Sequence, residues 1–479
     1  MADSEIERLR DSIDHAWDEA RNFGLDPFPT HFELVPATIM YEFASYSLPG
    51  RFSHWTHGKA FHRQKMQYDF GLSKIYEMVV NTNPSYAFLM EMNNLLQNTF
   101  VAAHVFGHTD FFKNNAYFQH TSRRMIDKVS IHAERIAKYE FDHGKAEVER
   151  FLDAVLSIQE HVDYNLFIRD DDPNEKEEKS VAQVTSEYDD LWGPERKAKK
   201  AEEEREKRLG KPPKFPEKPE KDILQFLMLH APHLEPWQRD IIEIVRTEML
   251  YFVPQMQTKV MNEGWASLWH SRIMRRLGDT GVISDSETVE FAQLHSSVLS
   301  PSPTSLNPYY LGFKMFEDIE KRWDNPTKEE QERFGRRPGM GHQKIFEVRE
   351  LDNDVSFLRN YLTKDLVQEL DLYIYRKEGD EWVIVEKDWE KVRDSIVASL
   401  TNFGYPYLVI DNGDYRGNSE LYIQHLFEGQ ELDLVYAEKT LQHVYQLWGR
   451  PVHLETVYED KRILLTYDGE RNTKSTLEK

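Results

Sequence analysis

Two histidines stand four residues apart in the stretch AAHVFGHTDFFKNN, residues 102–115, which is otherwise mostly apolar and aromatic. On a helix, positions i and i+4 lie one above the other on the same face, so His104 and His108 can point at a single ion. The same pair would also fit two buried imidazoles that each bond a backbone carbonyl or a carboxylate. The spacing alone leaves both interpretations open.

This spacing is also that of the zinc hydrolase motif H-E-x-x-H, in which the glutamate after the first histidine activates the metal-bound water. Here the glutamate position holds Val105. The chain has no cysteine, so any metal must be held by His, Asp or Glu. The sequence therefore offers two candidate ligands without the usual base.

A second stretch, NEGWASLWH at residues 262–270, resembles the region that supplies a glutamate ligand from a later helix in many zincin-type peptidases. The resemblance implies that Glu263 completes a three-ligand set and leaves an open position for water. The alternative for Glu263 is a carboxylate favoured by the dipole at a helix N-terminus. His270 lies two turns further along the same face, where it would be a further ligand, a general acid or a hydrogen-bond partner of a ligand.

Many long segments, in order, resemble the SpoVR family, stage V sporulation protein R. They are RFSHWTHGKAFHRQKMQYDFGLSKIYEMVVNTNPSYAFLMEMN, AHVFGHTDFFKNN, MNEGWASLWH, LNPYYLGFKMFEDIEKRWDNP, DNDVSFLRNYLT and YAEKTLQHVYQLWGRPVHLET. The resemblance covers nearly the whole chain outside a charged insertion. It implies a cytosolic bacterial protein that spore formers need for normal spore cortex peptidoglycan, and it supplies no reaction.

The family's shared residues that fit chemistry are His104, His108, Asp110, Asn114, Glu263 and His270. Asp110 points to a different helix face from His108, so ligation and the orientation of a ligand both stay open for it. In the absence of a glutamate at position 105, Asp110 and His270 are the candidates to take the proton. Asn114 is a candidate to contact ligands or substrate, or it caps the end of the helix.

Two aromatic-rich stretches hold further candidates for contacts with ligands or substrate. The stretch SHWTHGKAFH contains His54, His57 and His62, for which packing among surface aromatics is the alternative. In NPYYLGF, Tyr309 and Tyr310 are candidates to stabilise an oxyanion, or they are core aromatics with a hydrogen-bonded hydroxyl.

A different metal site would be a carboxylate-bridged di-iron or di-manganese bundle. It would combine the two histidines of 102–115 with Glu134, Glu140, His143, Glu160 and His161. Such bundles need Glu-x-x-His on two helices, and EFDH supplies one pair at Glu140 and His143. The sequence contains no second pair in this region, which makes the bundle the weaker hypothesis.

The composition restricts the class of protein. With 479 residues and 40% hydrophobic content, the chain can form two or three domains. Its net charge of −23 argues against nucleic acid as a main partner, because phosphate binding needs a positive surface. No window is long and apolar enough to span a bilayer, and the charged N-terminus lacks a signal-peptide pattern. We therefore expect a cytoplasmic protein.

Hydrophobic periodicity predicts mainly helices up to about residue 345 and short strands with one helix, near 437–448, beyond it. The other expected elements are helices at 1–24, 95–115 and 121–165, a strand at 85–93, and two or three helices over 222–278. Residues 170–221 are charged, rich in proline and poor in aliphatics, which predicts a flexible insertion.

The predicted fold class is a mainly α zincin-like metal-binding domain followed by a small α+β domain. The domains would be 1–169, a helical domain with the HxxxH helix; 170–221, the insertion; 222–345, a helical continuation with EGWASLWH; and 346–479, the C-terminal α+β domain.

The leading functional hypothesis is a hydrolase of peptidase or amidase type. It would bind one divalent metal, zinc before iron or manganese, through His104, His108 and Glu263, and cleave an amide in a peptide or peptidoglycan precursor. The first alternative is a non-catalytic regulatory or scaffold protein with a vestigial metal site, and the second is an iron-dependent oxidoreductase. Protein partners are expected at the charged insertion or the C-terminal domain.

Overall fold

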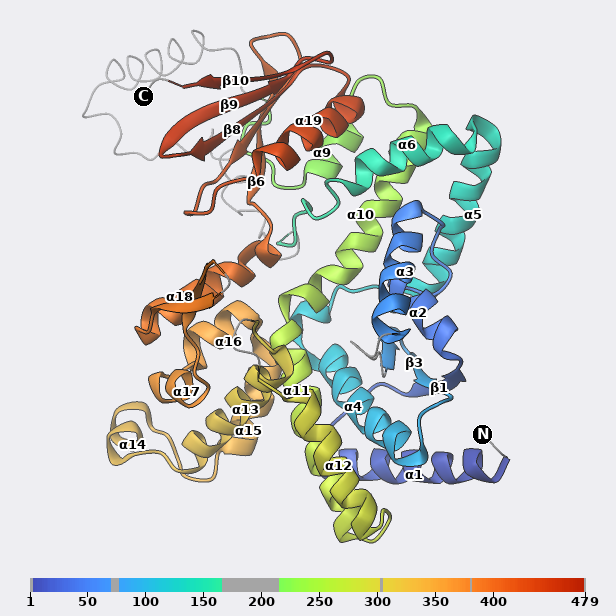
Figure 1. Cartoon of the computed structure of the whole chain (residues 1–479), viewed down its shortest axis with the longest axis vertical. Helices are drawn as coiled ribbons and strands as arrows, with labels where there is room; N and C mark the ends of the chain where they lie inside the picture. Colours follow the sequence, from blue (N-terminus) through green and yellow to red (C-terminus); the bar gives the residue numbers. More distant parts are fainter. Residues whose placement is uncertain (1–2, 70–76, 166–214, 302–304, 380, 478–479) are drawn as a thin grey trace, which may run out of the picture. The chain divides into compact units, whose positions relative to one another are not determined.

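The computed structural model describes residues 3–69, 77–165, 215–301, 305–379 and 381–477. The chain divides into two compact units, and each unit is built from two separate stretches of sequence (Figure 1). We call them the helical unit, Met1–Ala137 with Tyr251–Gly404, and the sheet unit, Lys138–Leu250 with Tyr405–Lys479.

The helical unit is dominated by α-helices. They are α1 (Asp3–Asn22), α2 (Ala37–Tyr46), α3 (Trp55–Asp69), α4 (Leu95–Asn114), α11 (Lys259–Asp279), α12 (Asp285–Val298), α13 (Pro308–Asp324), α14 (Lys328–Phe334), α15 (Gly341–Leu351), α16 (Asp354–Tyr361), α17 (Lys364–Glu369) and α18 (Trp389–Leu400). Short 3-10 turns occur at Ala116–Phe118 and Thr401–Gly404. Two long helices, α5 (Met125–His143) and α10 (Pro236–Gln257), each have residues assigned to both units.

Helix α4 lies in the core of the helical unit. It begins at a capping box, in which the Asn94 side chain accepts the backbone N–H of Gln97 and the Gln97 side chain accepts that of Asn94. Beyond its first turn, nearly every residue of α4 is buried on all sides of the helix. This confirms the helix predicted at 95–115 and places both of its histidines in the interior.

Small residues let the core helices approach closely. A Cβ atom added at Gly107 of α4 would lie 2.6 Å from the Cα atom of Ala266 in α11. A Cβ atom added at Gly264 would lie 2.3 Å from the carbonyl carbon of Gly312 in α13. Because Gly107 and Gly264 directly adjoin His108 and Glu263, these crossings determine how near the predicted ligands come to one another.

A three-stranded sheet packs beside these helices, with strand order β1 (Thr30–Val35), β3 (Ser85–Met90) and β2 (Glu77–Val80). Strand β1 is parallel to β3, whereas β2 is antiparallel to it. Strand β2 contacts α4, and its first residue, Glu77, pairs with Leu89. A small hairpin of β4 (Ile374–Glu378) and β5 (Glu381–Glu386) completes the strands of this unit that the structure describes.

The sheet unit contains a five-stranded sheet with the order β10-β9-β8-β7-β6. Its elements are α6 (Lys145–Leu156), α9 (Ile223–His230), β6 (Leu408–Tyr415), β7 (Glu420–His425), α19 (Leu434–Trp448), β8 (Val452–Tyr458), β9 (Lys461–Tyr467) and β10 (Asn472–Thr476). Strands β7 and β8 are parallel, and α19 forms the crossover between them. The helix predicted near 437–448 and several of the predicted strands are therefore present.

The division into units differs from the domains predicted from sequence. Residues 346–404 belong to the helical unit, because Val348, Phe357, Leu358 and Val392 join its core. The predicted helical domains 1–169 and 222–345 each contribute to both units. The predicted helix over 121–165 is broken between α5 and α6 at Gly144, whose φ of 91° favours glycine.

The predicted insertion at 170–221 lies mostly outside the described residues, but its last part does not fit a flexible segment. Lys221 is 2% exposed, and its ammonium lies 4.2 Å from the ring centroid of Tyr407. The backbone of Glu220 pairs with Ile410 of β6. The charged composition was misleading here because a lysine stem and ammonium can be buried against aromatic rings.

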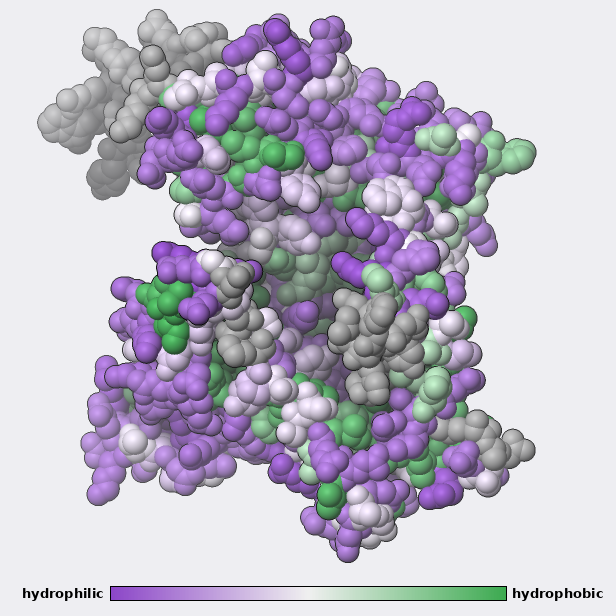
Figure 2. Space-filling model, in the orientation of Figure 1, coloured by the Kyte–Doolittle hydropathy of each residue, from purple (hydrophilic) through white to green (hydrophobic). Residues whose placement is uncertain are grey.

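The visible surface is mostly hydrophilic, with apolar side chains in small separate groups (Figure 2). Among the helices of the described ranges, none has the length and apolarity needed to cross a membrane. Both observations agree with the high charged content of the sequence.

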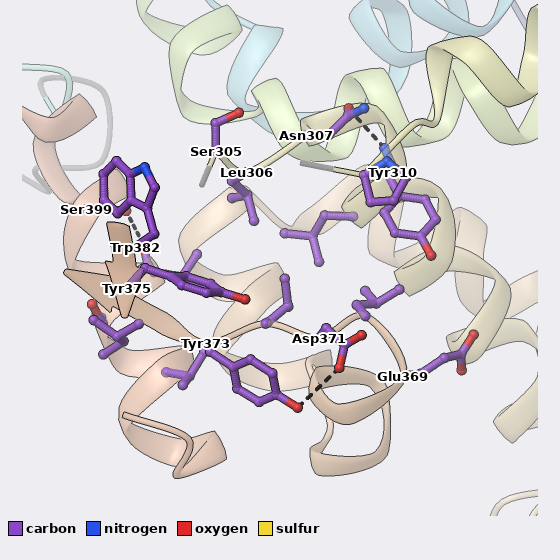
Figure 3. Close-up of a pocket in the computed structure, with 18 residues that line it drawn as sticks. Ser305, Leu306, Asn307, Tyr310, Glu369, Asp371, Tyr373, Tyr375, Trp382 and Ser399 are labelled. Carbon is purple, nitrogen blue, oxygen red and sulfur yellow. Dashed lines mark hydrogen bonds between the residues drawn. The ribbon is translucent and has the colours of Figure 1, made fainter. Parts of the chain in front are cut away.

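An open cavity of about 590 Å³ lies in the helical unit beside α13, α17, α18 and the β4–β5 hairpin (Figure 3). Its aromatic lining includes Tyr310, Tyr373, Tyr375 and Trp382. The hydroxyl of Tyr373 donates a hydrogen bond to Asp371, which also lines this cavity.

Candidate metal centre

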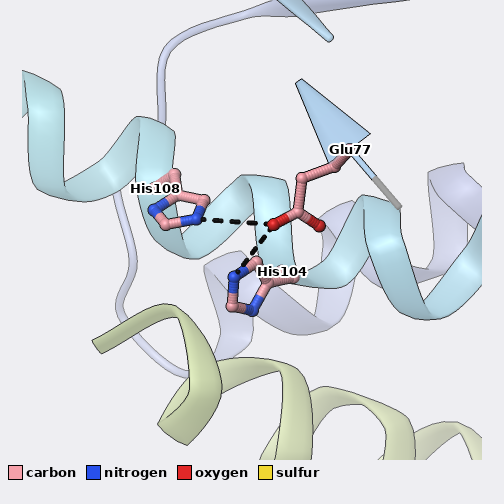
Figure 4. A group of neighbouring side chains, drawn as sticks. All are labelled: Glu77, His104 and His108. Carbon is pink, nitrogen blue, oxygen red and sulfur yellow. Dashed lines mark ion pairs between the residues drawn. The ribbon is translucent and has the colours of Figure 1, made fainter. Parts of the chain in front are cut away.

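Four donor side chains from three elements converge beside α4. The Nε2 atom of His104 lies 3.3 Å from Glu77 Oε1 and 3.6 Å from Glu263 Oε2. The Nε2 atom of His108 lies 3.9 Å and 3.5 Å from the same two oxygens. Figure 4 shows Glu77 reaching from β2 toward both imidazoles. The structure thus brings together the three predicted ligands and adds a second carboxylate.

These separations suit a single bound cation. For zinc bonds of about 2.0–2.2 Å, tetrahedral geometry places neighbouring donor atoms about 3.3–3.6 Å apart. His104 Nε2 and Glu263 Oε2 are both buried without a hydrogen-bond partner, although buried polar atoms are normally paired. Two neutral imidazoles and two carboxylates also balance the charge of a divalent ion. The residues present therefore fit a divalent metal.

The outer nitrogens of the two histidines are held by hydrogen bonds. His108 Nδ1 donates to the side-chain oxygen of Asn262, 2.9 Å away, which leaves Nε2 with its lone pair toward the centre. His104 Nδ1 lies 2.8 Å from Nδ1 of His270. Partners of this kind fix the tautomer and orientation of imidazole ligands.

Opposite charges stabilise one another in this group when no ion is bound. Burial alone would raise the pKa of Glu77, but the imidazoles of His104 and His108 hold it below its usual value. Burial opposes the charge on His108, yet the carboxylates of Glu77 and Glu263 raise its pKa. A metal ion therefore has to displace a proton from this group when it binds.

The centre retains access to water through its carboxylates. The side chains of Glu77 and Glu263 are 18% and 17% exposed, whereas that of His104 is 3% exposed. Tyr309 stands beside them with its ring stacked on His104 at a centroid distance of 6.0 Å. Its hydroxyl is hydrogen-bonded to Glu263, and the charge of that carboxylate, together with burial, holds the pKa of Tyr309 well above its usual value. Tyr309 thus keeps its proton and is a hydrogen-bond donor at the centre, whereas Tyr310 lines the separate cavity of Figure 3.

His270 touches the centre through another histidine. Its Nδ1 atom bonds His104, and its Nε2 atom lies 2.8 Å from Nδ1 of His295 on α12. Burial and the neighbouring histidines hold the pKa of His270 well below its usual value. Burial likewise lowers the pKa of His295 to about 4, so both rings are neutral near pH 7. Among the roles considered for His270, hydrogen bonding to a ligand is the one that this geometry favours.

Asp110 does not face the donors. Its Oδ1 atom accepts the backbone N–H of Asp26 at 2.8 Å, and its Oδ2 atom accepts the indole N–H of Trp265 at 2.8 Å. Asn114 donates to the backbone oxygen of Asp110 at 2.7 Å. These bonds join the end of α4 to α11 and to the loop after α1, which explains both residues structurally. The candidate roles of Asp110 as a base and of Asn114 as a ligand or substrate contact are therefore not supported by their positions.

His54 and His57 pack elsewhere in the helical unit. The ring of His57 contacts those of Tyr46 and Phe52, and burial lowers its pKa to about 4. His54 Nδ1 bonds the Thr56 hydroxyl. No contact between these histidines and the four donors is recorded within the described ranges, so the predicted contact with ligands is not observed.

The alternative two-metal bundle is not assembled. His143 stacks on Trp237 in the sheet unit, with a centroid distance of 4.6 Å. Within the part of the chain that the structure describes, the donor atoms of Glu77, His104 and His108 all lie close enough together to share one ion, and Glu263 lies within 3.6 Å of both imidazoles. A single-ion centre is the arrangement that the described donors support.

Glu77 is the residue that the sequence did not reveal. It opens the short strand EMVV, and no spacing relates it to the histidines 27 and 31 positions later. The one available signal was a carboxylate at the start of a half-buried strand. The pairing of β2 with β3, and the packing of this sheet on α4, are what bring it to the centre.

Comparison with known proteins identifies a family and a relative that the chain matches over most of its length. The family model described as SpoVR like protein matches residues 3–405, and that described as SpoVR-like C-terminal domain matches residues 406–459. The uncharacterized protein YcgB of Escherichia coli (strain K12) is 31% identical over 474 residues, which cover 93% of this chain and 91% of the relative. No solved structure matches the chain.

Proposed function

We propose that this chain, which belongs to the SpoVR family, binds one divalent metal ion through His104, His108 and Glu263 and hydrolyses an amide bond. The observation that supports the proposal is the convergence of these donors with Glu77 at separations of 3.3–3.9 Å, two of the atoms being buried without a partner. Zinc is the first candidate for the ion.

When bound, such an ion supplies Lewis acidity, which polarises a carbonyl and lowers the pKa of water. The base that we propose in place of the glutamate of H-E-x-x-H is Glu77, which comes from strand β2 and lies 3.3 Å from His104 and 3.9 Å from His108. Its Oε1 atom takes a proton from the attacking water and passes it to the amide nitrogen as the C–N bond breaks. Tyr309 donates its hydroxyl proton in a hydrogen bond to the oxygen on which negative charge develops.

The substrate class that we propose is a peptide or a peptidoglycan precursor. The family resemblance links such proteins to spore cortex peptidoglycan, and peptidoglycan stems contain amide bonds. The partly exposed carboxylates at the centre are the groups that such a substrate would meet first.

Metal analysis of the purified full chain tests the proposal. We expect one zinc per chain in the unaltered protein and less than a tenth of that in His104→Ala, with the exposed His15→Ala unchanged as a control. Loss of amide cleavage from muropeptides in His104→Ala, followed by mass spectrometry, would connect the metal to the reaction.

Other outcomes would replace the proposal. Absence of any bound metal after reconstitution would leave a regulatory or scaffold protein. Iron in place of zinc, with an absorption band that disappears in His104→Ala, would favour the oxidoreductase, because two histidines and a carboxylate also hold iron in oxygenases.

A further inference from the structure

Three imidazole rings form a hydrogen-bonded chain that starts at the candidate metal centre. The rings belong to three helices: His104 to α4, His270 to α11 and His295 to α12. The two ring-to-ring bonds, Nδ1 to Nδ1 and then Nε2 to Nδ1, are both 2.8 Å long. His104 is 3% exposed and His270 is fully buried, whereas His295 is partly exposed. The chain therefore leads from the interior to a residue that does not touch the donors.

The direction of the hydrogen bonds follows from the tautomers. A neutral imidazole has one N–H donor and one acceptor nitrogen. When the lone pair of His104 Nε2 is committed to an ion, the proton of that ring must sit on Nδ1 and be donated to His270 Nδ1. His270 then carries its own proton on Nε2 and donates it to His295 Nδ1. A single set of tautomers therefore makes both hydrogen bonds and leaves the lone pair of His104 Nε2 available to the ion.

Apolar rings pack against two members of this chain, His270 and His295. Phe100 lies 4.6 Å from the ring of His270, and Phe291 and Phe313 lie 5.7 Å and 5.5 Å from that of His295, all between centroids. These rings accept no strong hydrogen bond, so they favour bonds between the imidazoles themselves. His108, by contrast, is held by one amide, that of Asn262, on the helix that also carries Glu263.

We propose that His270 and His295 are positioning residues that hold His104 in the tautomer and orientation needed for metal binding. The inference rests on the metal centre proposed above. If the proposal is right, the affinity for the metal depends on a hydrogen-bond acceptor at position 295. This residue lies on α12, a helix that supplies no ligand. The dependence is specific to an acceptor at the place of His295 Nδ1, and an apolar side chain of similar volume does not replace it.

Paired substitutions at position 295 test this. In His295→Asn, the side-chain amide oxygen lies near the place of the original Nδ1 and can accept from His270, whereas His295→Leu keeps the volume and removes the acceptor. The full-length proteins are titrated with zinc against a chelator and with cobalt by absorption spectroscopy. We expect about a tenfold loss of affinity in His295→Leu, as is typical for partners of ligating histidines, and less than about a threefold loss in His295→Asn.

A packing role predicts the reverse order, because leucine suits a pocket of phenylalanines better than asparagine does. Melting of the metal-free proteins controls for folding, and His15→Leu on α1 controls for the removal of an exposed histidine. The pair His270→Asn and His270→Leu repeats the comparison one ring closer to the centre.

The outcomes separate the two proposals. If the unaltered protein binds stoichiometric metal and both variants at position 295 bind as it does, or if leucine binds more tightly than asparagine, the positioning role is wrong and the metal centre stands. If the unaltered protein binds no metal, the proposed function fails, and the role of the imidazole chain fails with it.

Discussion

At the residue scale, the proposed function assigns to separate elements two tasks that neighbouring residues of one helix perform in H-E-x-x-H hydrolases. Helix α4 supplies two imidazoles, while the position between them, Val105, is fully buried in the core. The second carboxylate arrives from strand β2 as Glu77. A base that lies on a different element from the ligands can be altered with little effect on the ligand helix.

Glu77→Gln tests this separation. If Glu77 is the base, the variant should still bind metal while amide hydrolysis falls about 10²- to 10⁴-fold, the usual contribution of a general base. Metal content and turnover are measured on the same sample. Glu91→Gln, an exposed carboxylate just beyond the next strand, is the matched control. Loss of metal in Glu77→Gln would instead make Glu77 a ligand.

Val105→Glu should fail to restore the missing motif. The residue is 0% exposed, so a carboxylate there would be buried without a designed partner, and we expect a loss of about 3 kcal/mol or more in the free energy of unfolding. Denaturant titration of this variant beside Val105→Ala, which only removes methyl groups, measures the cost of the charge. A variant as stable as the original and more active would contradict the expectation.

The sequence revealed part of this centre. Helical spacing was sufficient to pair His104 with His108, and a family resemblance added Glu263. Glu77 and His295 were not found, because each meets the others only through tertiary packing of a short strand or a separate helix. Asp110 was misjudged, since a buried carboxylate that joins two helices has the same appearance in sequence as a catalytic one.

At the scale of elements, the close crossings of α4, α11 and α13 determine the geometry of the centre. Gly264→Ala should disturb it, because the added methyl would lie 2.3 Å from the backbone of Gly312 and force α11 away from α13. We expect a loss of about 2–4 kcal/mol in stability together with weaker metal binding.

The comparison for that variant is Gly58→Ala in α3, where nothing lies within 4 Å of the added methyl. Alanine should be neutral there or stabilise the helix by up to about 1 kcal/mol. Thermal melting and zinc titration are measured for both. Equal behaviour of the two variants would show that the crossing tolerates a wider separation.

The N-terminus of α11 makes stability depend on pH. Asp354 on α16 accepts the backbone N–H groups of Val260 and Met261 at 2.8 and 2.9 Å, and its burial raises its pKa to about 7. The folded protein therefore keeps a proton that the unfolded chain releases above about pH 4, so this group's contribution to stability falls as the pH rises toward 7.

Asp354→Asn should flatten that dependence. Denaturant unfolding at pH 5 and pH 8 should show that the original protein loses about 2.6 kcal/mol relative to the variant over this interval. The exposed Asp365→Asn serves as the control. Parallel pH profiles for the original and Asp354→Asn would rule out the buried carboxyl as the cause.

Elements with a strong local pattern were predicted well. Helix α4, which is buried nearly all round, the strand at 85–93 and the helix near 437–448 can each be recognised from the pattern of their own residues. Strand β1 was not predicted, because it is short and its pairing partner is distant in sequence. The partner, β3, begins 55 positions after the start of β1. Its stability derives from that partner rather than from its own six residues.

At the scale of the whole molecule, the units are interleaved in sequence. The boundary at residue 346 was predicted where the expected elements change from helices to strands. The compact sheet unit instead resumes at residue 405. The family models meet one residue later, between residues 405 and 406. The change in predicted secondary structure does not mark the boundary, because the β4–β5 hairpin consists of strands but belongs to the helical unit.

Metal should stabilise one unit selectively. All four donors lie in the helical unit. Zinc at one hundred times its dissociation constant should therefore raise the free energy needed to open α4, α11 and β2 by about 2.7 kcal/mol. Hydrogen exchange with and without zinc measures this, with β8 and α19 of the sheet unit as internal references. Equal protection of both units, or an unchanged pattern in α4, would contradict it.

Because the two units are interleaved in sequence, the donor residues are synthesised at different times. Glu77, His104 and His108 leave the ribosome early, but Glu263 follows 155 positions after His108, once the first stretch of the sheet unit has been made. At about 5–20 residues per second, the nascent chain holds an incomplete set of donors for roughly 10–30 s. Under the proposed function, an ion captured in that interval would meet Glu77, His104 and His108 without Glu263, and the complete set of donors forms only when α11 packs against α4.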